Sequence, residues 1–168
     1  MKKVLLFVLM LAVLPLSSAS AINISYNAND LGSGLWQFDY YVSGYNFDTD
    51  YGFQIIYDYG LYENITPISS SSDWDVLAWD PDLIFGVPDD GVYDALALVD
   101  NASLSSPFSV QFNWLGLGNP NGQYFEVYDS SFAYADSGQT APVPEPATLM
   151  LLAAGLAGLG FTKRFKKA

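Results

Sequence analysis

The chain has 168 residues, no cysteine, no histidine and a formal net charge of −12. Its six basic residues lie near the two ends, and all 18 carboxylates lie between them. Without His or Cys, the chain cannot form Ser–His or Cys–His nucleophiles or zinc sites built from those residues. Without Lys or Arg, the anionic middle cannot bind phosphate or nucleic acid through cationic side chains. The length predicts one domain, and an aromatic content of 16% predicts that this domain folds.

Residues 1–21 have the pattern of a secretory signal peptide. Two lysines follow Met1, an apolar run occupies residues 4–14, and Pro15 ends it. Ala19 and Ala21 are the small residues that a signal peptidase requires, so cleavage is predicted after Ala21. The alternative is an uncleaved anchor helix, but this run is short for the ~30 Å hydrocarbon core of a membrane.

Residues 22–135 alternate apolar and polar side chains in short runs, which is typical of β-strands with one buried face. The clearest run is Phe108–Trp114, where four apolar residues alternate with Ser, Gln and Asn. Turns rich in Gly, Pro and Asn separate several runs. The pattern predicts an all-β fold, a two-sheet antiparallel β-sandwich of jelly-roll or immunoglobulin-like topology. Strands are predicted at residues 22–28, 36–42, 53–59, 76–79, 93–99, 108–114, 124–128 and 132–135.

Carboxylates cluster in the predicted loops of this domain, and oxygen-only ligands suit a hard cation such as calcium. Asp89, Asp90 and Asp94 are the calcium candidates, although no loop matches the twelve-residue EF-hand pattern. The simpler interpretation is that these are solvated, turn-forming side chains that keep an edge-rich β domain soluble. No other cofactor is expected.

Tryptophan side chains offer a second kind of candidate site. Trp36 and Trp114 lie in phase with strand faces that are predicted to be buried. Trp74 and Trp79 lie in the Asp-rich loop region, where they could stack on pyranose rings. Two carboxylates could also support glycoside hydrolysis, but no pair stands out, so an enzyme is not expected.

The end of the chain contains three features in a fixed order. After a predicted linker at residues 136–142 come four motif residues, an apolar segment at 147–161 and a basic tail at 162–168. As a helix the apolar segment would be about 22 Å long, and flanking cations can snorkel to cover the rest of a bilayer. Basic residues favour the cytoplasmic side, which places the domain outside. The basic cluster is Lys163, Arg164, Lys166 and Lys167.

This order of features resembles the PEP-CTERM sorting signal of exopolysaccharide-producing Gram-negative bacteria. In that family a membrane-embedded exosortase recognises the Pro-Glu-Pro motif, removes the tail and passes the protein toward the cell surface. The resemblance implies that the basic cluster is the stop-transfer anchor. The alternative is an ordinary C-terminal membrane anchor with a proline-rich stalk. The implied recognition motif is Val143, Pro144, Glu145 and Pro146.

These features predict an exported protein that is held transiently in the inner membrane by a C-terminal transmembrane helix. Its final location would be the cell surface or the extracellular matrix of a biofilm. The expected role is structural or adhesive and non-catalytic; the alternative is a carbohydrate-binding module, with or without calcium. The expected partners are signal peptidase, the exosortase, the membrane and extracellular polysaccharide, and nucleic acid is not among them.

Overall fold

The computed structural model describes residues 22–144. This part of the chain consists of strands without a helix, so the all-β prediction is confirmed for it, and no helix within it could cross a membrane. The predicted signal peptide, the transmembrane helix and the basic tail lie outside the described residues. The strands are β1 (Asn23–Gly32), β2 (Leu35–Ser43), β3 (Gly52–Tyr57), β4 (Tyr62–Ser69), β5 (Trp74–Trp79), β6 (Asp82–Ile84), β7 (Val87–Asp89), β8 (Gly91–Ala97), β9 (Phe108–Trp114), β10 (Tyr124–Tyr128), β11 (Tyr134–Gln139) and β12 (Ala141–Pro142).

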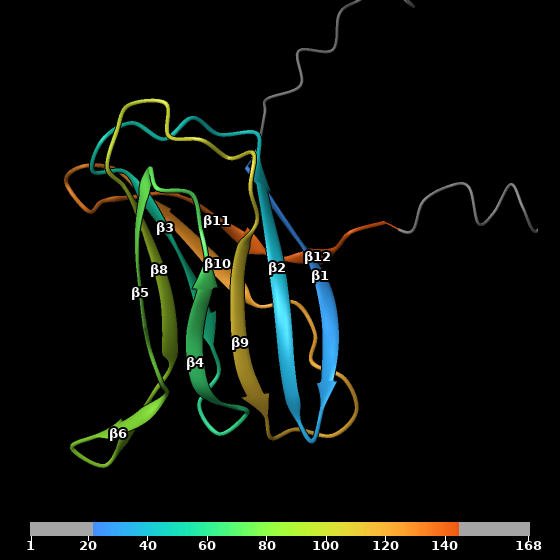
Figure 1. The fold of residues 1–168 in the computed structure, drawn as a ribbon. Coiled ribbons are helices and arrows are strands. Elements are labelled where there is room, and N and C mark those ends of the chain that lie inside the picture. Colours follow the sequence, from blue (N-terminus) through green and yellow to red (C-terminus); the bar gives the residue numbers. More distant parts are fainter. Residues whose placement is uncertain (1–21, 145–168) are drawn as a thin grey trace, which may run out of the picture.

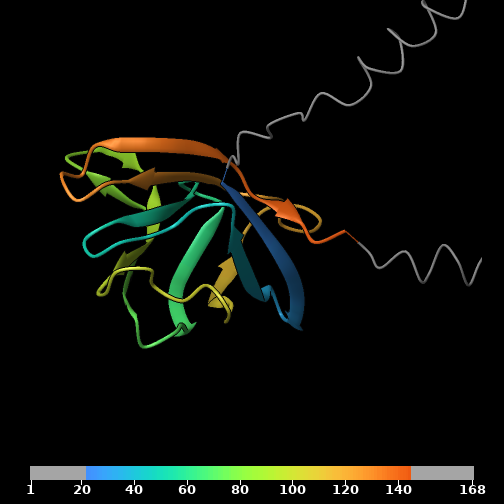
Figure 2. The same cartoon turned by 90° about the horizontal axis from the view of Figure 1, so that it is seen from above.

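Most of the strands belong to two five-stranded sheets (Figures 1 and 2). Sheet A has the order β12-β1-β2-β9-β4, and sheet B has the order β11-β10-β3-β8-β5. Neighbouring strands are antiparallel, as predicted, except that β12 runs parallel to β1. β6 and β7 pair only with each other and form a hairpin that projects from the body of the domain in Figure 1.

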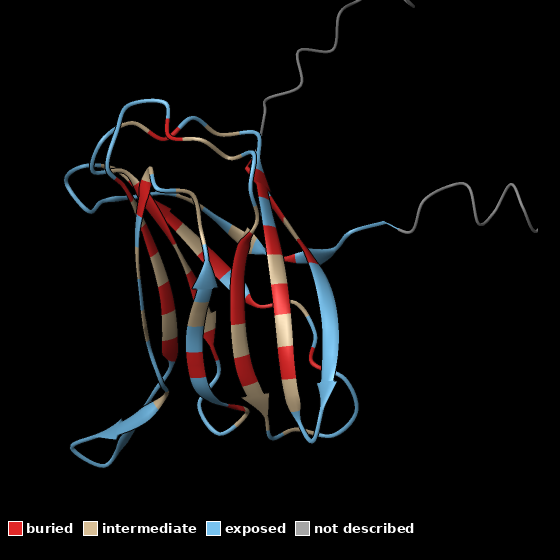
Figure 3. Cartoon of the chain, in the orientation of Figure 1, coloured by how far each residue is buried: buried red, intermediate tan, exposed pale blue. Residues whose placement is uncertain are grey.

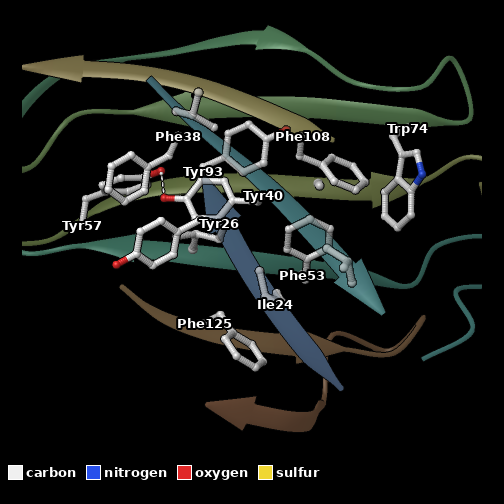
Figure 4. Packing of buried hydrophobic residues seen from close by; sticks show 14 of the residues in the cluster. Ile24, Tyr26, Phe38, Tyr40, Phe53, Tyr57, Trp74, Tyr93, Phe108 and Phe125 are labelled. Carbon is white, nitrogen blue, oxygen red and sulfur yellow. Dashed lines mark hydrogen bonds between the residues drawn. The ribbon is translucent and has the colours of Figure 1, made fainter. Parts of the chain in front are cut away.

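The apolar faces of the two sheets pack against each other and form the core. Phe53 of sheet B and Phe108 of sheet A have ring centroids 4.9 Å apart, and Tyr57 and Phe112 meet across the sheets at 5.6 Å. Buried and less buried residues alternate along the strands (Figure 3), and aromatic rings fill the space between the sheets (Figure 4). Each buried ring removes a large apolar surface from water, so a domain without disulfides is held together by this packing.

A hydrogen-bonded chain of polar side chains crosses this aromatic core. The Tyr40 hydroxyl donates to Gln123 Oε1 at 2.9 Å and lies 3.0 Å from the Tyr57 hydroxyl (Figure 4). Because Tyr40 has one proton, which points to Gln123, Tyr57 is the donor in the second bond. Gln123 Nε2 donates to the Tyr62 hydroxyl at 3.0 Å. Burial raises the pKa of Tyr40 and of Tyr57, so both remain neutral donors.

Residues 136–142, predicted to be a linker, are built into the two sheets instead. The end of β11 pairs with β10, and β12 pairs with β1. Thr140 lies between them and is buried, and its backbone N–H donates to Gln123 O at 2.8 Å. The linker prediction is wrong because edge strands are largely solvated and lack the apolar alternation of central strands.

The structure also contains strand β4 and the β6–β7 hairpin, which the sequence pattern did not predict. In β4 the alternation is interrupted, because Asn64 has a φ of 57° and the pairing with β9 shifts register after Glu63. β6 and β7 are three-residue strands, too short for a periodic pattern to appear.

Candidate functional site

The sorting motif begins directly at the edge of the folded domain. Ala141 and Pro142 lie beside Ser25 and Tyr26 in sheet A. The backbone N–H of Val143, the first motif residue, donates to Tyr26 O at 2.9 Å. Pro144 is the last described residue, and Glu145 and Pro146 lie beyond it. No spacer therefore separates this domain from the start of the motif.

The same edge receives the beginning of the domain. β1 starts at Asn23, one residue after the buried Ile22 and two after the predicted signal-peptide cleavage site at Ala21. β12 runs beside β1 in the same direction, so the chain enters and leaves through neighbouring strands. The first and last strands of the described chain therefore lie side by side at one edge of sheet A.

The prediction that Trp74 is a sugar-stacking platform is wrong. Its side chain is 5% exposed and packs against the rings of Phe47, Phe53 and Phe108 at 5.1, 5.7 and 5.0 Å. Its indole N–H donates to Ser103 O at 3.0 Å. Trp74 begins β5 with its ring turned into the core, where the burial of a large ring stabilises the fold most (Figure 4).

Trp79, the second candidate platform, lies at the other end of β5 and is 47% exposed. Leu77, two residues earlier in the strand, is also exposed. Alternation along β5 places both residues on the outer face of sheet B, opposite Trp74. A sugar platform built from Trp74 and Trp79 together is therefore excluded, although Trp79 by itself is accessible.

The structure does not assemble Asp89, Asp90 and Asp94 into a metal site. Among residues 22–144, no group of three or more metal-ligating side chains is placed to hold an ion. Asp90 accepts from the backbone N–H of Tyr59 at 2.7 Å. Asp94, on the outer face of sheet B, accepts from Gln54 Nε2 at 3.0 Å. Burial raises the pKa of Asp94 in spite of this bond.

Other carboxylates accept hydrogen bonds from backbone N–H groups. This agrees with the interpretation of the loop carboxylates as turn-forming side chains. Asp80 accepts from the N–H of Ile65 at 2.6 Å, and Asp73 from the N–H of Ser103 at 3.0 Å. Asp100 accepts from both the N–H and the hydroxyl of Thr49, and these bonds lower the pKa of Asp100.

An open groove lies on sheet B over β10 and β11, and none of its residues was a candidate in the sequence. It has a volume of about 380 Å³. Pairing of β10 with β11 sets Glu126 opposite Ser137 and Tyr128 opposite Tyr134, so side chains from both strands share the outer face of sheet B. A register shift sets Asp136 opposite the buried Val127, so the side chain of Asp136 is not on the face of Glu126. The groove is lined by Tyr124, Glu126, Tyr134, Ala135, Asp136 and Ser137.

The groove combines accessible aromatic rings with the carboxylate of Glu126. Tyr124 is 39% exposed and Tyr134 is 72% exposed. The negative charge of Glu126, together with a hydrogen bond to it, raises the pKa of the Tyr134 hydroxyl. Glu126 has no cationic partner within residues 22–144, because that part of the chain includes no Lys, Arg or His. The described residues therefore bring no positive charge to this groove.

The polar surface continues from the groove across sheet B. Glu126 pairs with Gln54, and Gln54 pairs with Asp94 on the next strand. The Tyr128 hydroxyl donates to Asp94 Oδ1 at 2.9 Å. Gly52 makes this possible, because a Cβ at that position would overlap the Tyr128 hydroxyl.

The sequence contained a signal for half of the groove. In residues 124–128 the apolar Phe125 and Val127 alternate with Tyr124 and Glu126, which predicts the latter pair on the outer face. Tyr134 and Asp136 could not be added, because their neighbours have no alternation. The pairing of β10 with β11 is what brings the two halves together.

The projecting β6–β7 hairpin is the most apolar exposed segment of the described chain. Leu83, Ile84 and Val87 are each exposed by half or more, and Phe85 is fully exposed. Phe85 and Gly86 form the turn with φ values of 52° and 81°. Positive φ at both turn positions suits a tight hairpin, but it is uncommon for a residue as bulky as Phe.

Comparison with known families supplies the remaining evidence on function. Residues 142–164 match the model of the PEP-CTERM protein-sorting motif. No curated protein and no solved structure matches the chain. The match contains all four motif residues, the apolar segment and the start of the basic tail, which confirms the resemblance seen in the sequence. The chain therefore carries a PEP-CTERM sorting signal, which marks it as an exported protein processed by an exosortase.

Proposed function

We propose that the ectodomain is a β-sandwich that serves as a non-catalytic structural or adhesive component at the cell surface or in the extracellular matrix. A cleaved signal peptide would deliver it across the inner membrane, and the apolar segment 147–161 would hold it there until exosortase releases it. The sorting motif supports export and processing. The observation that supports an adhesive role is the β6–β7 hairpin.

This hairpin has the properties of a contact element. It projects from the end of the domain away from β12, from which the sorting tail continues (Figures 1 and 2). Phe85 lies at its tip in a backbone conformation that costs a bulky residue about 1 kcal/mol or more, and that cost suggests a role for the ring. Asp82 and Asp89 pair at the base of the hairpin and keep this end of it hydrated.

The role of the hairpin is tested with Phe85→Asn in the producing cells, because Asn tolerates positive φ and removes the ring. Burial of one Phe contributes about 1.5–3 kcal/mol, so we expect the fraction of protein retained on cells and matrix to fall about tenfold. Leu117→Asn is the matched control, since Leu117 is as exposed but lies in the β9–β10 loop. Equal retention of the two variants would contradict the proposed role of the hairpin.

Carbohydrate binding is the alternative function, and the observation that favours it is the groove on β10 and β11. Exposed tyrosine rings beside carboxylates are the groups that stack on pyranose rings and accept hydrogen bonds from hydroxyls. With Trp74 in the core, the candidate residues for this function become Tyr124 and Tyr134, and no bound calcium is needed for their stacking.

A further inference from the structure

We propose that the groove over β10 and β11 binds a glycan that carries free amino groups, with the rings of Tyr124 and Tyr134 against the sugar faces and the carboxylate of Glu126 paired with an amine. This inference rests on the carbohydrate-binding alternative and adds a ligand class to it. It does not depend on the adhesive role of the hairpin.

The groove has the size and shape of a site for a short sugar chain. Its volume of about 380 Å³ is within the range of about 300–1,000 Å³ found for small-ligand sites. Tyr124 also lines a smaller cavity of about 80 Å³ with Asp58 and Gln139, so polar surface continues past that ring. A groove on a sheet face that continues at one end suits a chain of sugars better than a single enclosed molecule.

The rings of Tyr124 and Tyr134 are exposed and not packed in the core. Large tyrosines elsewhere in the domain, such as Tyr40, Tyr57 and Tyr93, are fully buried, because the core is where an aromatic ring stabilises a fold. Tyr124 and Tyr134 instead leave much of their surface in water on either side of Glu126. The C–H faces of pyranose rings would cover this surface and leave the sugar hydroxyls free to bind polar groups.

The charge of the groove favours a cationic ligand. The carboxylate of Glu126 lies between the two rings, and the described chain offers no cationic side chain to pair with it. An anionic glycan would be repelled by this carboxylate. An ammonium group would pair with it and would also interact favourably with the electron-rich faces of Tyr124 and Tyr134. Charge therefore selects an amine-bearing glycan over a neutral or anionic one.

Titration calorimetry on the full chain in detergent micelles tests the ligand class. The probes are tetramers of glucosamine, N-acetylglucosamine and glucose at about pH 6, where the free amines are protonated. We expect the glucosamine tetramer to bind at least about tenfold more tightly than the other two. Absence of heat with the glucosamine tetramer, or equal affinity for the acetylated or glucose tetramer, would overturn the inference.

Matched variants separate the groove from general attraction to an anionic protein. Tyr134→Ala and Glu126→Gln should each weaken binding of the glucosamine tetramer about tenfold. Tyr59→Ala removes an exposed ring from the β3–β4 turn, and Asp89→Asn removes an exposed carboxylate from β7; both should leave binding unchanged. Equal losses in the groove and control variants would overturn the assignment to the groove. Retention of Phe85→Asn on cells reports on the hairpin alone, so the two proposals fail independently.

Discussion

The backbone N–H of Val143 donates a hydrogen bond to the carbonyl oxygen of Tyr26 at 2.9 Å. This bond joins the first residue of the sorting motif to the first strand of the domain. β12 lies directly before Val143 and pairs with β1. Sheet A is therefore complete only when residues near both ends of the described chain are folded into it. The first residue of the sorting motif is therefore attached to the folded domain.

Loss of this bond should weaken the attachment of the tail. Val143→Pro removes the N–H donor and leaves Pro144, Glu145 and Pro146 intact. We expect the free energy of unfolding of the full chain in detergent to fall by about 1 kcal/mol. Ala141→Ser is the control, since Ala141 is exposed and the substitution keeps its backbone groups. A midpoint of thermal unfolding for Val143→Pro equal to that of the control would show that the bond does not form.

The two tryptophans of β5 should differ sharply in their contribution to stability. Trp74→Ala empties a site enclosed by three aromatic rings and should lower the free energy of unfolding by about 3–5 kcal/mol. Trp79→Ala removes a half-exposed ring and should lower it by less than about 1 kcal/mol. Urea denaturation monitored by circular dichroism measures both. Similar losses in the two variants would contradict the assignment of Trp74 to the core.

Removal of two buried tyrosine hydroxyls, those of Tyr93 and Tyr40, should change the free energy of unfolding in opposite directions. The Tyr93 hydroxyl is buried and has no hydrogen-bond partner among residues 22–144, so Tyr93→Phe should raise the free energy of unfolding by up to about 1 kcal/mol. Tyr40→Phe removes the donor to Gln123 Oε1 and the acceptor of the Tyr57 hydroxyl, and it should lower the free energy of unfolding by about 1–3 kcal/mol. Denaturation midpoints measured side by side check the sign of each effect. A loss of stability in Tyr93→Phe would show that its hydroxyl has a partner.

Asp94 should make stability depend on pH. Burial raises its folded-state pKa, so its contribution to stability is present below the unfolded pKa and is lost as the pH rises through the folded pKa. Asp94→Asn keeps an oxygen that accepts from Gln54 and Tyr128 and removes the charge. We therefore expect it to raise the denaturation midpoint at pH 7, with a gain that shrinks as the pH approaches the ordinary Asp value of about 3.9.

Asp129 supplies a control of opposite sign for this pH effect. Hydrogen bonds from Ser131 and Ala133 lower the pKa of Asp129, so its contribution to stability is present above the unfolded pKa and is lost as the pH falls through the folded pKa. Asp129→Asn should lower the midpoint at pH 7. The same sign for the two variants would contradict the difference between their environments.

The strands with an uninterrupted alternation were predictable from the sequence. β9 and β10 occupy residues 108–114 and 124–128, as predicted. Alternation reports burial of one strand face, so it identifies central strands well and fails at edges. Residues 136–142 show this failure, since β11 and β12 are edge strands that pair through backbone groups with little apolar side-chain burial.

The functional surfaces were less predictable than the fold. The sorting motif is local in sequence, so its residues could be identified directly. Trp74 was misplaced because the serines and aspartates around it indicate a loop, although Trp74, Val76 and Ala78 share the inner face of β5. The groove depends on the pairing of β10 with β11, which no local pattern reveals.

The central claim is that this chain is exported and that both of its ends are removed. Intact-mass spectrometry of the protein recovered from its producing cells, fraction by fraction, measures this directly. The predicted result is an extracytoplasmic species that begins at Ile22 and has lost the apolar segment and the basic tail after Pro146. Recovery of the complete polypeptide, from Met1 to Ala168, in the cytoplasm would contradict the claim.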